Sequence, residues 1–253
     1  MVLADFGAGV RGGFSTRAGG VGSGRFATAN MSGSVGDDPG VVATNRARLA
    51  DWAGAPITFH RQVHGVRVAG AGDPVTDADA VLGGPGDAVA VLAADCLPVL
   101  LADVAAGVVA AAHAGRRGLA AGVLQATVEA MTARGADPRR IAAVVGPGIC
   151  GLCYEVPPAM REEVADLVPG TASTTRAGTP SLDLPAGAVG VLTRAGVGSV
   201  RALGSCTAES PTLFSHRRDG APGAPTGRIA AVVSLPDRAR PLDRAGPPDR
   251  VSR

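Results

Sequence analysis

The 253-residue sequence has few aromatic residues, no lysine and a net charge of only +2. One Trp, one Tyr and five Phe leave little aromatic surface on which nucleic-acid bases could stack. All 24 basic residues are arginines, and acidic residues are interspersed among them rather than segregated from them. The sequence therefore lacks the basic stripe that is typical of nucleic-acid-binding proteins, and we expect no nucleic-acid partner.

Long apolar stretches are also missing. No run of 18 or more apolar residues is present, so we predict no transmembrane helix and no membrane partner. The first eleven residues include Asp5 and lack the basic start and apolar run of a signal peptide. Four cysteines are too few for a dense disulfide framework in a chain of this length. We therefore expect a cytoplasmic protein, a monomer or homodimer, whose thiols are free or bound to metal.

Hydrophobic residues make up 46% of the chain, which is enough for a sizeable core of Val, Leu, Ile and Ala. Near-continuous apolar runs at 88–93, 98–102 and 107–112 are typical of strands buried on both faces. Helices are predicted to begin at Asp38-Pro39 and to cover residues 118–134, 157–168 and 185–195. This mixed order predicts one α+β domain over residues 1–236, followed by a disordered tail rich in Arg, Asp and Pro over residues 237–253.

Three residues that can coordinate a metal each follow an apolar, strand-like run: His64, Cys96 and His113. If those strands are neighbours, their ends converge. Two imidazoles and one thiolate form a workable zinc site that leaves a fourth position for water or substrate. The alternative is that Cys96 packs as a small hydrophobe while backbone carbonyls satisfy both histidines. Asp95 could accept a hydrogen bond from an imidazole, carry a proton, or cap a local turn.

Arginines mark a candidate anion site. Arg116 and Arg117 lie at the predicted start of a helix, where the macrodipole favours anions rather than cations. Phosphate is the natural ligand for such a place, although two solvated surface arginines would explain the pattern equally well. Arg217, together with Arg46 and Arg48, could also surround an anionic substrate, or these arginines could simply be solvated.

A single CxxC motif, Cys150 to Cys153, follows Gly-Pro-Gly-Ile rather than opening a helix, so it does not fit thioredoxin-like redox chemistry. A zinc site of four thiolates would need a second such motif, and Cys96 and Cys206 do not make one. The sequence therefore favours a loop with packing thiols at this position.

An ordered set of short motifs carries a resemblance to a known family. The motifs run from residue 14 to residue 219: Phe-Ser-Thr-Arg-x-Gly-Gly (14–20), Gly-Asp-Asp (36–38), Asn-Arg (45–46), Gln-Val-His-Gly (62–65), Ala-Asp-Ala (78–80), Ala-Asp-Cys-Leu-Pro (94–98), His-Ala-Gly-x-Arg-Gly (113–118), Gly-Pro-x-Ile (146–149), Cys-Tyr-Glu-Val (153–156) and Phe-Ser-x-Arg-Arg-Asp (214–219). Each is weak alone, but their order over residues 5–235 resembles the laccase-domain, or multicopper polyphenol oxidase, family, which is now treated as a family of purine nucleoside phosphorylases.

The resemblance implies a single-domain, layered α/β/β/α sandwich related to that of proposed cysteine hydrolases. It implies zinc on His64, Cys96 and His113, the same three residues that their ligand chemistry and their places after apolar runs indicate. It also implies phosphorolysis of adenosine, inosine and methylthioadenosine, and hydrolytic deamination of adenosine. The substrates would be purine nucleosides and phosphate. The chain departs from the family pattern at Arg116, where the family usually has a Trp that could hold a flat base.

On this hypothesis Cys96, His113 and Asp95 are the catalytic residues, while Arg46, Arg117 and Arg217 bind phosphate. Three alternatives follow from the same residues. The older family label implies Cu²⁺-dependent phenol oxidation, yet four histidines are too few for several copper sites. A cysteine hydrolase acting on cell-wall precursors or peptides would use Cys96 as nucleophile and His113 as base. A zinc-stabilised binding module without catalytic activity is a third reading.

Overall fold

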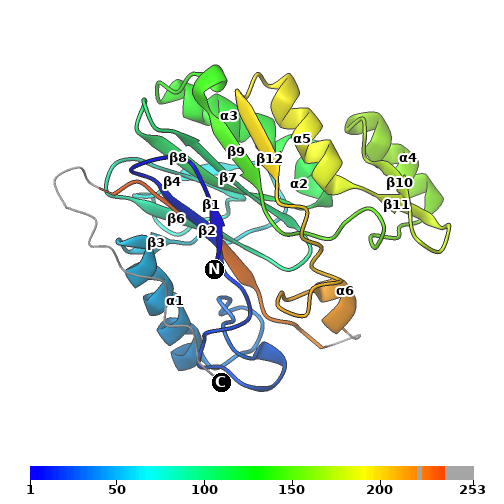
Figure 1. The fold of residues 1–253 in the computed structure, drawn as a ribbon, viewed down its shortest axis with the longest axis horizontal. Helices are drawn as coiled ribbons and strands as arrows, with labels where there is room; N and C mark the ends of the chain where they lie inside the picture. The colour runs from blue at the N-terminus through cyan, green and yellow to red at the C-terminus, as the bar shows by residue number, and fades with distance from the viewer. Residues whose placement is uncertain (221–223, 237–253) are drawn as a thin grey trace.

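In the computed structural model, which describes residues 1–220 and 224–236, the main strands form two mixed sheets that pack against each other (Figure 1). The five-stranded sheet has the order β1 (Val2–Ala4), β2 (Arg11–Phe14), β13 (Ile229–Ser234), β6 (Ala88–Ala93) and β3 (Ile57–Thr58). The six-stranded sheet has the order β12 (Ser199–Ala202), β9 (Ala142–Val145), β7 (Leu97–Asp103), β8 (Val108–Ala114), β5 (Ala80–Gly83) and β4 (Val68–Gly70). A separate hairpin pairs β10 (Ala172–Thr174) with β11 (Pro180–Leu182).

Helices cover the outer faces of this pair of sheets. The five-stranded sheet carries α1 (Pro39–Ala53). The six-stranded sheet carries α2 (Arg116–Ala121), α3 (Val123–Ala133) and α5 (Leu184–Arg194), with α4 (Pro158–Leu167) beside the hairpin (Figure 1). The short elements are α6 (His216–Asp219) and the 3₁₀ turns η1 (Gly24–Phe26) and η2 (Pro138–Arg140). The α+β class and the four-layer α/β/β/α arrangement expected from the sequence are confirmed.

The central strands are buried on both faces because their side chains alternate between two cores. On β6, Val89 and Val91 pack between the sheets with Phe14, while Ala88 and Ala90 face α1. The same alternation divides β13 between the two cores. A third and larger core lies between the six-stranded sheet and its helices. This two-sided burial explains why strands β6, β7 and β8 are continuous apolar runs in the sequence.

The start of α1 agrees with the sequence prediction, whereas the predicted helix over residues 118–134 does not. The Asp38 carboxylate accepts a hydrogen bond from the Val41 backbone N–H at 2.9 Å, and Pro39 occupies the first turn. The predicted helix is instead two helices, α2 and α3, because Gly122 adopts a left-handed conformation with φ of +98° between them. The helix also begins two residues earlier than predicted, at Arg116.

A long loop between β2 and α1 is held in place by buried amide groups. Asn45, on the inner side of α1, donates hydrogen bonds to the carbonyls of Thr28 and Asn30 at 3.2 and 3.0 Å. The Asn30 side chain in turn accepts from the backbone N–H of Arg228 at 2.9 Å. These bonds fix the loop against β13 and set the position of Arg46, the neighbour of Asn45 on α1.

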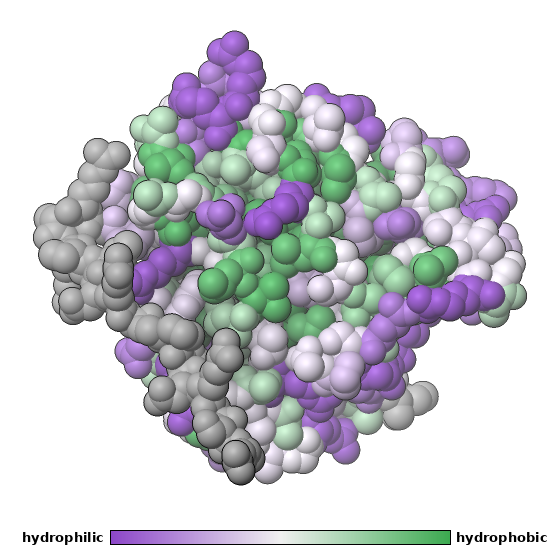
Figure 2. Space-filling view, in the orientation of Figure 1, coloured by the Kyte–Doolittle hydropathy of each residue, from purple (hydrophilic) through white to green (hydrophobic). Residues whose placement is uncertain are grey.

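Hydrophobic residues gather in the middle of the face shown in Figure 2, and hydrophilic residues gather towards its lower right, in the region of α6. Within residues 1–220 and 224–236, no helix is long and apolar enough to cross a membrane. The predicted tail, residues 237–253, lies outside the described residues.

Candidate metal and anion site

Two loops and the end of a strand bring the predicted metal ligands together. His64 lies in the connection between β3 and β4, Cys96 in the connection between β6 and β7, and His113 near the end of β8. Their ligand atoms all lie within 4.8 Å of one another. The Cys96 Sγ is 3.7 Å from the His64 Nε2, and the two imidazole rings meet edge to face with centroids 4.8 Å apart.

His113 is oriented by a carboxylate that the sequence analysis did not assign to the site. Its Nδ1 donates a hydrogen bond to the Asp79 Oδ1 at 2.8 Å, and both side chains are almost fully buried. This bond fixes the tautomer, so Nε2 is the nitrogen left for coordination. Burial alone would raise the pKa of Asp79, but hydrogen bonds from His113 and from backbone N–H groups outweigh it and lower that pKa.

The same carboxylate shapes the loop that carries His64. Its oxygens accept hydrogen bonds from three successive backbone N–H groups, those of Val63, His64 and Gly65, at 2.7 to 3.1 Å. His64 has φ of +61°, a left-handed conformation that is costly for a side chain of this size. The three bonds to Asp79 compensate for this cost and present the His64 ring to Cys96.

Asp95 and Cys96 lie where the chain leaves one sheet for the other. Asp95 also has a left-handed backbone, with φ of +86°. Its two oxygens accept hydrogen bonds from the Thr207 hydroxyl and from the Arg217 backbone N–H, both at 2.6 Å. Asp95 therefore connects the turn before Cys96 to the start of α6. The structure gives it no hydrogen bond to either imidazole.

Gly115 leaves the space that the cluster occupies. A Cβ at this position would lie 2.8 Å from the His64 Cδ2 and 2.9 Å from the Cys96 Sγ. Contacts this short would force the ligands apart. Gly115 has ordinary negative φ, so the requirement for glycine here comes from this close approach and not from the backbone.

The electrostatics of the cluster favour a thiolate. Burial alone would raise the pKa of the Cys96 thiol, but the neighbouring imidazoles of His113 and His64 lower it to about 6. Burial likewise opposes the charging of His113, yet its bonds to Asp79 and Cys96 raise the pKa of this imidazole. The thiolate is the form in which cysteine binds a divalent metal, and the metal replaces the Nε2 proton of His113 when it binds.

The donor set fits zinc. Bonds of about 2.0 Å to nitrogen and about 2.3 Å to sulfur in a tetrahedral site place the N and S ligands about 3.6 Å apart. The 3.7 Å between the Cys96 Sγ and the His64 Nε2 matches this separation. Three protein ligands leave one position open to the cavity described next, as in catalytic zinc sites.

A cavity of about 680 Å³ opens beside the cluster and is lined by all three ligands. Its size lies in the range typical of small-molecule sites, roughly 300–1,000 Å³. Arginines contribute much of the wall: Arg46, Arg61, Arg116, Arg217 and Arg228. Asp95, Phe59 and Tyr154 also line it.

Of the predicted phosphate ligands, the structure brings Arg46 and Arg217 to the cavity but not Arg117. Arg46 is half-buried, donates from Nε to the Met31 carbonyl at 2.8 Å and lies over the Phe59 ring. Arg116 lines the cavity in place of Arg117, which is exposed, because successive residues of a helix point about 100° apart. Arg48 is likewise exposed and is not part of the wall.

Sequence reasoning missed Asp79, Thr207 and Arg228 as parts of this site. The sequence did contain a signal for Asp79. It is flanked by alanines and precedes an apolar strand, so its carboxylate is expected to be buried and to need hydrogen-bond partners. Thr207 and Arg228 come from segments more than 100 residues away from Cys96 and carry no local signal.

Comparisons with known proteins agree with this picture. Residues 11–236 match the family described as multi-copper polyphenol oxidoreductase laccase. A protein of Streptomyces griseus named purine nucleoside phosphorylase is 50% identical over 232 residues, which is 88% of this chain and 93% of the relative. One of Mycobacterium tuberculosis with the same name is 48% identical over 87% of this chain and 89% of the relative.

Solved structures share the fold as well. A Neisseria meningitidis protein superposes with a TM-score of 0.84 at 37% identity, over 93% of this chain and 98% of that one. The protein YlmD of Geobacillus stearothermophilus superposes with a TM-score of 0.82 at 31% identity, over 91% and 93% of the two chains. The family match over residues 11–236 extends from β2 through β13 and includes every residue of the metal cluster. The chain therefore belongs to the multi-copper polyphenol oxidoreductase laccase family.

Proposed function

We propose that this chain is a zinc-dependent purine nucleoside phosphorylase that acts on adenosine, inosine and methylthioadenosine and also deaminates adenosine. The observation that carries the proposal is the His64–Cys96–His113 cluster in the wall of an arginine-lined cavity. The names of the relatives at 48–50% identity support the same class of enzyme. The cavity is large enough for a nucleoside and a phosphate ion together.

The arginines of the cavity are the groups that would bind phosphate. In phosphorolysis a phosphate oxygen attacks C1′ of the ribose, the C1′–N9 bond breaks, and the bonding electrons leave with the purine. Arg46, Arg116 and Arg217 present charged donors to the anion and hold it in place for this attack. That Arg117 takes part stays a prediction, which its exposed position does not favour.

The metal ligands serve the second reaction. Zinc held by His64, Cys96 and His113 would supply water of lowered pKa for attack at C6 of adenine, with release of ammonia. Asp79 keeps His113 in the coordinating tautomer, and the Asp95 turn holds the Cys96 sulfur beside the cavity. Asp95, predicted as a catalytic residue, is better suited to this positioning role, because both of its oxygens already accept hydrogen bonds.

Incubation of the zinc-loaded protein with adenosine, with and without phosphate, tests both activities. Chromatography separates adenine, the product of phosphorolysis, from inosine, the product of deamination. We expect adenine and ribose 1-phosphate only when phosphate is present, and inosine in either condition, with part of the inosine converted to hypoxanthine when phosphate is present. Persistence of all the adenosine with metal-loaded protein would refute the proposal.

Copper-dependent phenol oxidation is less well supported by the site. Of the histidines outside the cluster, His60 is engaged by backbone groups: its Nδ1 accepts from the Thr76 N–H at 3.2 Å. Neither His60 nor His216 belongs to a metal-binding group among the described residues. A dye-oxidation assay on copper-loaded protein tests this alternative, and we expect no turnover.

The arrangement of Cys96, His113 and Asp79 also resembles a nucleophile, a base and an orienting carboxylate. This geometry favours a cysteine hydrolase as the second candidate. Such an enzyme would cleave ester or peptide substrates without metal and would lose activity when zinc covers the sulfur. The proposed enzyme would instead need zinc for its deaminase reaction, so one titration with metal distinguishes the two.

A further inference from the structure

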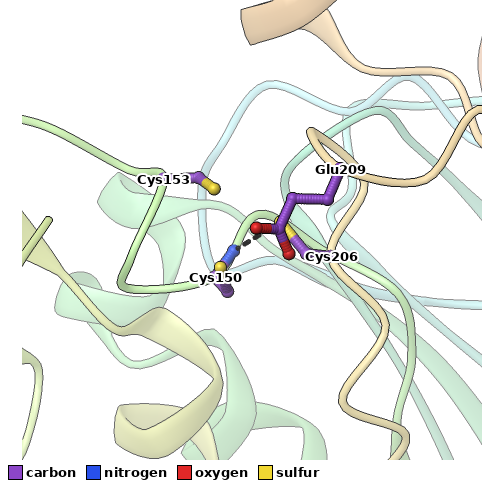
Figure 3. Close-up of side chains that lie close together, drawn as sticks. All are labelled: Cys150, Cys153, Cys206 and Glu209. Carbon is purple, nitrogen blue, oxygen red and sulfur yellow. Dashed lines mark hydrogen bonds between the residues drawn. The ribbon is translucent and has the colours of Figure 1, made fainter. Parts of the chain in front are cut away.

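A second group of metal-binding side chains lies outside the cavity. Cys150 and Cys153 come from the loop between β9 and α4, and Cys206 and Glu209 from the loop between β12 and α6. Their ligand atoms all lie within 4.8 Å of one another, and the side chains converge on a common point (Figure 3). We refer to these four residues as the cysteine cluster.

We propose that the cysteine cluster binds a second Zn²⁺ ion in a closed, tetrahedral site of three thiolates and one carboxylate. None of the four residues belongs to the cavity wall. The site has no position left for substrate, so its role is structural: it joins the two loops that carry it. The sequence favoured packing thiols here, because Cys206 has no CxxC partner of its own. The fold supplies Cys206 singly, from the loop after β12, which runs beside the loop that follows β9.

Ligand chemistry selects zinc for this cluster. Three soft thiolates exclude Mg²⁺ and Ca²⁺, which prefer oxygen ligands. A CxxC motif places two sulfurs on one ion, and zinc accepts Asp or Glu oxygen as the remaining ligand. In a tetrahedral site with Zn–S bonds of about 2.3 Å, the sulfurs lie about 3.8 Å apart. The 4.8 Å limit on the present separations leaves only a small contraction to be made.

The backbone already holds both loops in the required geometry. Gly148 and Cys206 form a bridge between the loops, and the Thr207 N–H donates to the Gly148 carbonyl at 3.0 Å. The N–H groups of Cys153 and Tyr154 both donate to the Cys150 carbonyl at 3.0 Å, which closes a tight turn around the motif. The Cys150 N–H donates to the Cys206 Sγ at 3.4 Å (Figure 3). Metal binding would therefore require little further ordering of the two loops.

Charge is balanced by an arginine beside the cluster. Zinc with three thiolates and one carboxylate carries a net charge of −2. The Arg176 guanidinium forms an ion pair with Glu209 and donates to the Cys153 Sγ at 3.7 Å. A carboxylate has two oxygens, so Glu209 can coordinate through one and keep Arg176 on the other. Arg176 thus reduces the excess negative charge without occupying a ligand position.

Cys206 is buried, but burial does not support a packing role for the two thiols of the CxxC motif. Cys150 and Cys153 are both half-exposed, and Glu209 is exposed, so a metal ion can reach the cluster from solvent. A core cysteine that packs as a small hydrophobe is fully buried and has no carboxylate or guanidinium next to its sulfur. All four cysteines of the chain are free thiols in this structure.

The second site is connected to the first through adjacent residues. Cys150 follows Ile149, and Cys153 precedes Tyr154, and both of these neighbours line the cavity. Cys206 precedes Thr207, whose hydroxyl bonds to Asp95. A zinc ion in the cysteine cluster would therefore hold one wall of the cavity and the support of the Asp95 turn, although it contacts no substrate.

Metal analysis of the intact protein tests this proposal without reference to any activity. The protein is refilled with excess Zn²⁺ under reducing conditions, desalted and analysed by atomic mass spectrometry. We expect about two zinc ions per chain. The variants Cys96→Ser and Cys153→Ser should each retain about one, and the double variant none. Glu209→Gln is expected to bind its second ion at least tenfold more weakly, and Glu163→Gln, an exposed carboxylate on α4, serves as the matched control.

Co²⁺ in place of zinc identifies the ligands. The near-ultraviolet absorption of thiolate–cobalt bonds grows with the number of thiolates, so Cys96→Ser should lose the smaller part of it and Cys153→Ser the larger. Circular dichroism establishes that each variant is folded. One zinc ion per wild-type chain that disappears in Cys96→Ser would overturn the proposal. So would full retention of two ions by folded Cys153→Ser, or a protein mass two hydrogens short because two cluster cysteines have formed a disulfide.

Discussion

The carboxylate of Asp79 accepts a hydrogen bond from the Nδ1 of His113 and, at the same time, from the backbone N–H of His64 at 2.9 Å. One buried acid thus positions two of the three residues of the metal cluster. It fixes the ring of one histidine and the backbone of the other. The geometry of the cluster therefore depends on a residue that touches neither metal nor substrate.

Replacement of Asp79 by Asn should weaken zinc binding by roughly 10- to 100-fold, as is usual when the partner of a metal-bound histidine is lost. The amide cannot accept from His113 and three backbone N–H groups in the same way. Competition with a chromophoric chelator measures the affinity. Asp166→Asn, an exposed change on α4, is the matched control. Unchanged affinity in Asp79→Asn would contradict the positioning role.

Gly115→Ala should abolish zinc binding at the first site while the protein remains folded. Its methyl group would lie within 3 Å of the Cys96 Sγ and the His64 ring. Zinc content and thermal melting separate the two effects. Gly72→Ala, where an added Cβ meets nothing within 4 Å, should keep its zinc. A structure of Gly115→Ala with zinc bound in the normal geometry would contradict the prediction, because it would show that the ligands can move to accommodate the methyl group.

Arg46→Met should raise the KM for phosphate by roughly 10- to 100-fold, because a charge-assisted hydrogen bond contributes about 1.5–3 kcal/mol. Burial lowers the pKa of Arg46 from its usual value, but the side chain stays charged. The KM for the nucleoside should change much less. Steady-state kinetics at varied phosphate provide the measurement, with the exposed Arg194→Met on α5 as the control. Equal changes in both KM values would argue against phosphate recognition by Arg46.

The surroundings of Asp103 predict that the free energy of unfolding depends on pH. Burial alone would raise its pKa, but the backbone N–H groups of Asp137 and Ala106 and the guanidinium of Arg140 outweigh burial and lower it. The ionised form therefore stabilises the native state above about pH 4, the ordinary range of an Asp in the unfolded chain. That stabilisation is lost as the pH falls through the native pKa of Asp103.

Urea unfolding of Asp103→Asn against wild type measures this contribution. At neutral pH the free energy of unfolding of the variant should be lower by about 1–3 kcal/mol, because the NH₂ group of the new amide is a donor and cannot accept the hydrogen bond from the Asp137 N–H. The difference should narrow as the pH falls below about 4. Asp51→Asn, exposed on α1, should show no such convergence. A constant difference at all pH values would exclude Asp103 as its source.

The sequence predicted those elements whose signals are local. The Asp38-Pro39 start of α1 and the apolar runs of β6, β7 and β8 follow from capping and burial, and all are present in the structure. The break at Gly122 was missed because glycine is tolerated within helices and its left-handed conformation is decided by the packing of α2 and α3. Strand β5 was missed because its four residues lie among turns.

The candidate site was predictable to the extent that each ligand stands at the end of an apolar, strand-like run of the sequence, although His113 belongs to β8 itself. His64, Cys96 and His113 stood out for this reason, and the fold brings them together. The part of the site that depends on register between distant segments could not be deduced. Which of Arg116 and Arg117 faces the cavity depends on the phase of α2, and the approach of Cys206 to the CxxC motif depends on the pairing of β12 with β9.

The passage of the chain from β6 to β7 through Asp95 and Cys96 is one of the connections between the two sheets, whose facing sides meet through side-chain packing. The Cys96 sulfur is thus attached to a connection between the sheets, while His113 belongs to one sheet. Truncation of Phe14, which packs between the sheets, would let the sheets slide against each other. Such sliding would move the Cys96 sulfur relative to the His113 imidazole. Substitutions deep in the inter-sheet core should consequently reduce the zinc content of the protein before they unfold it.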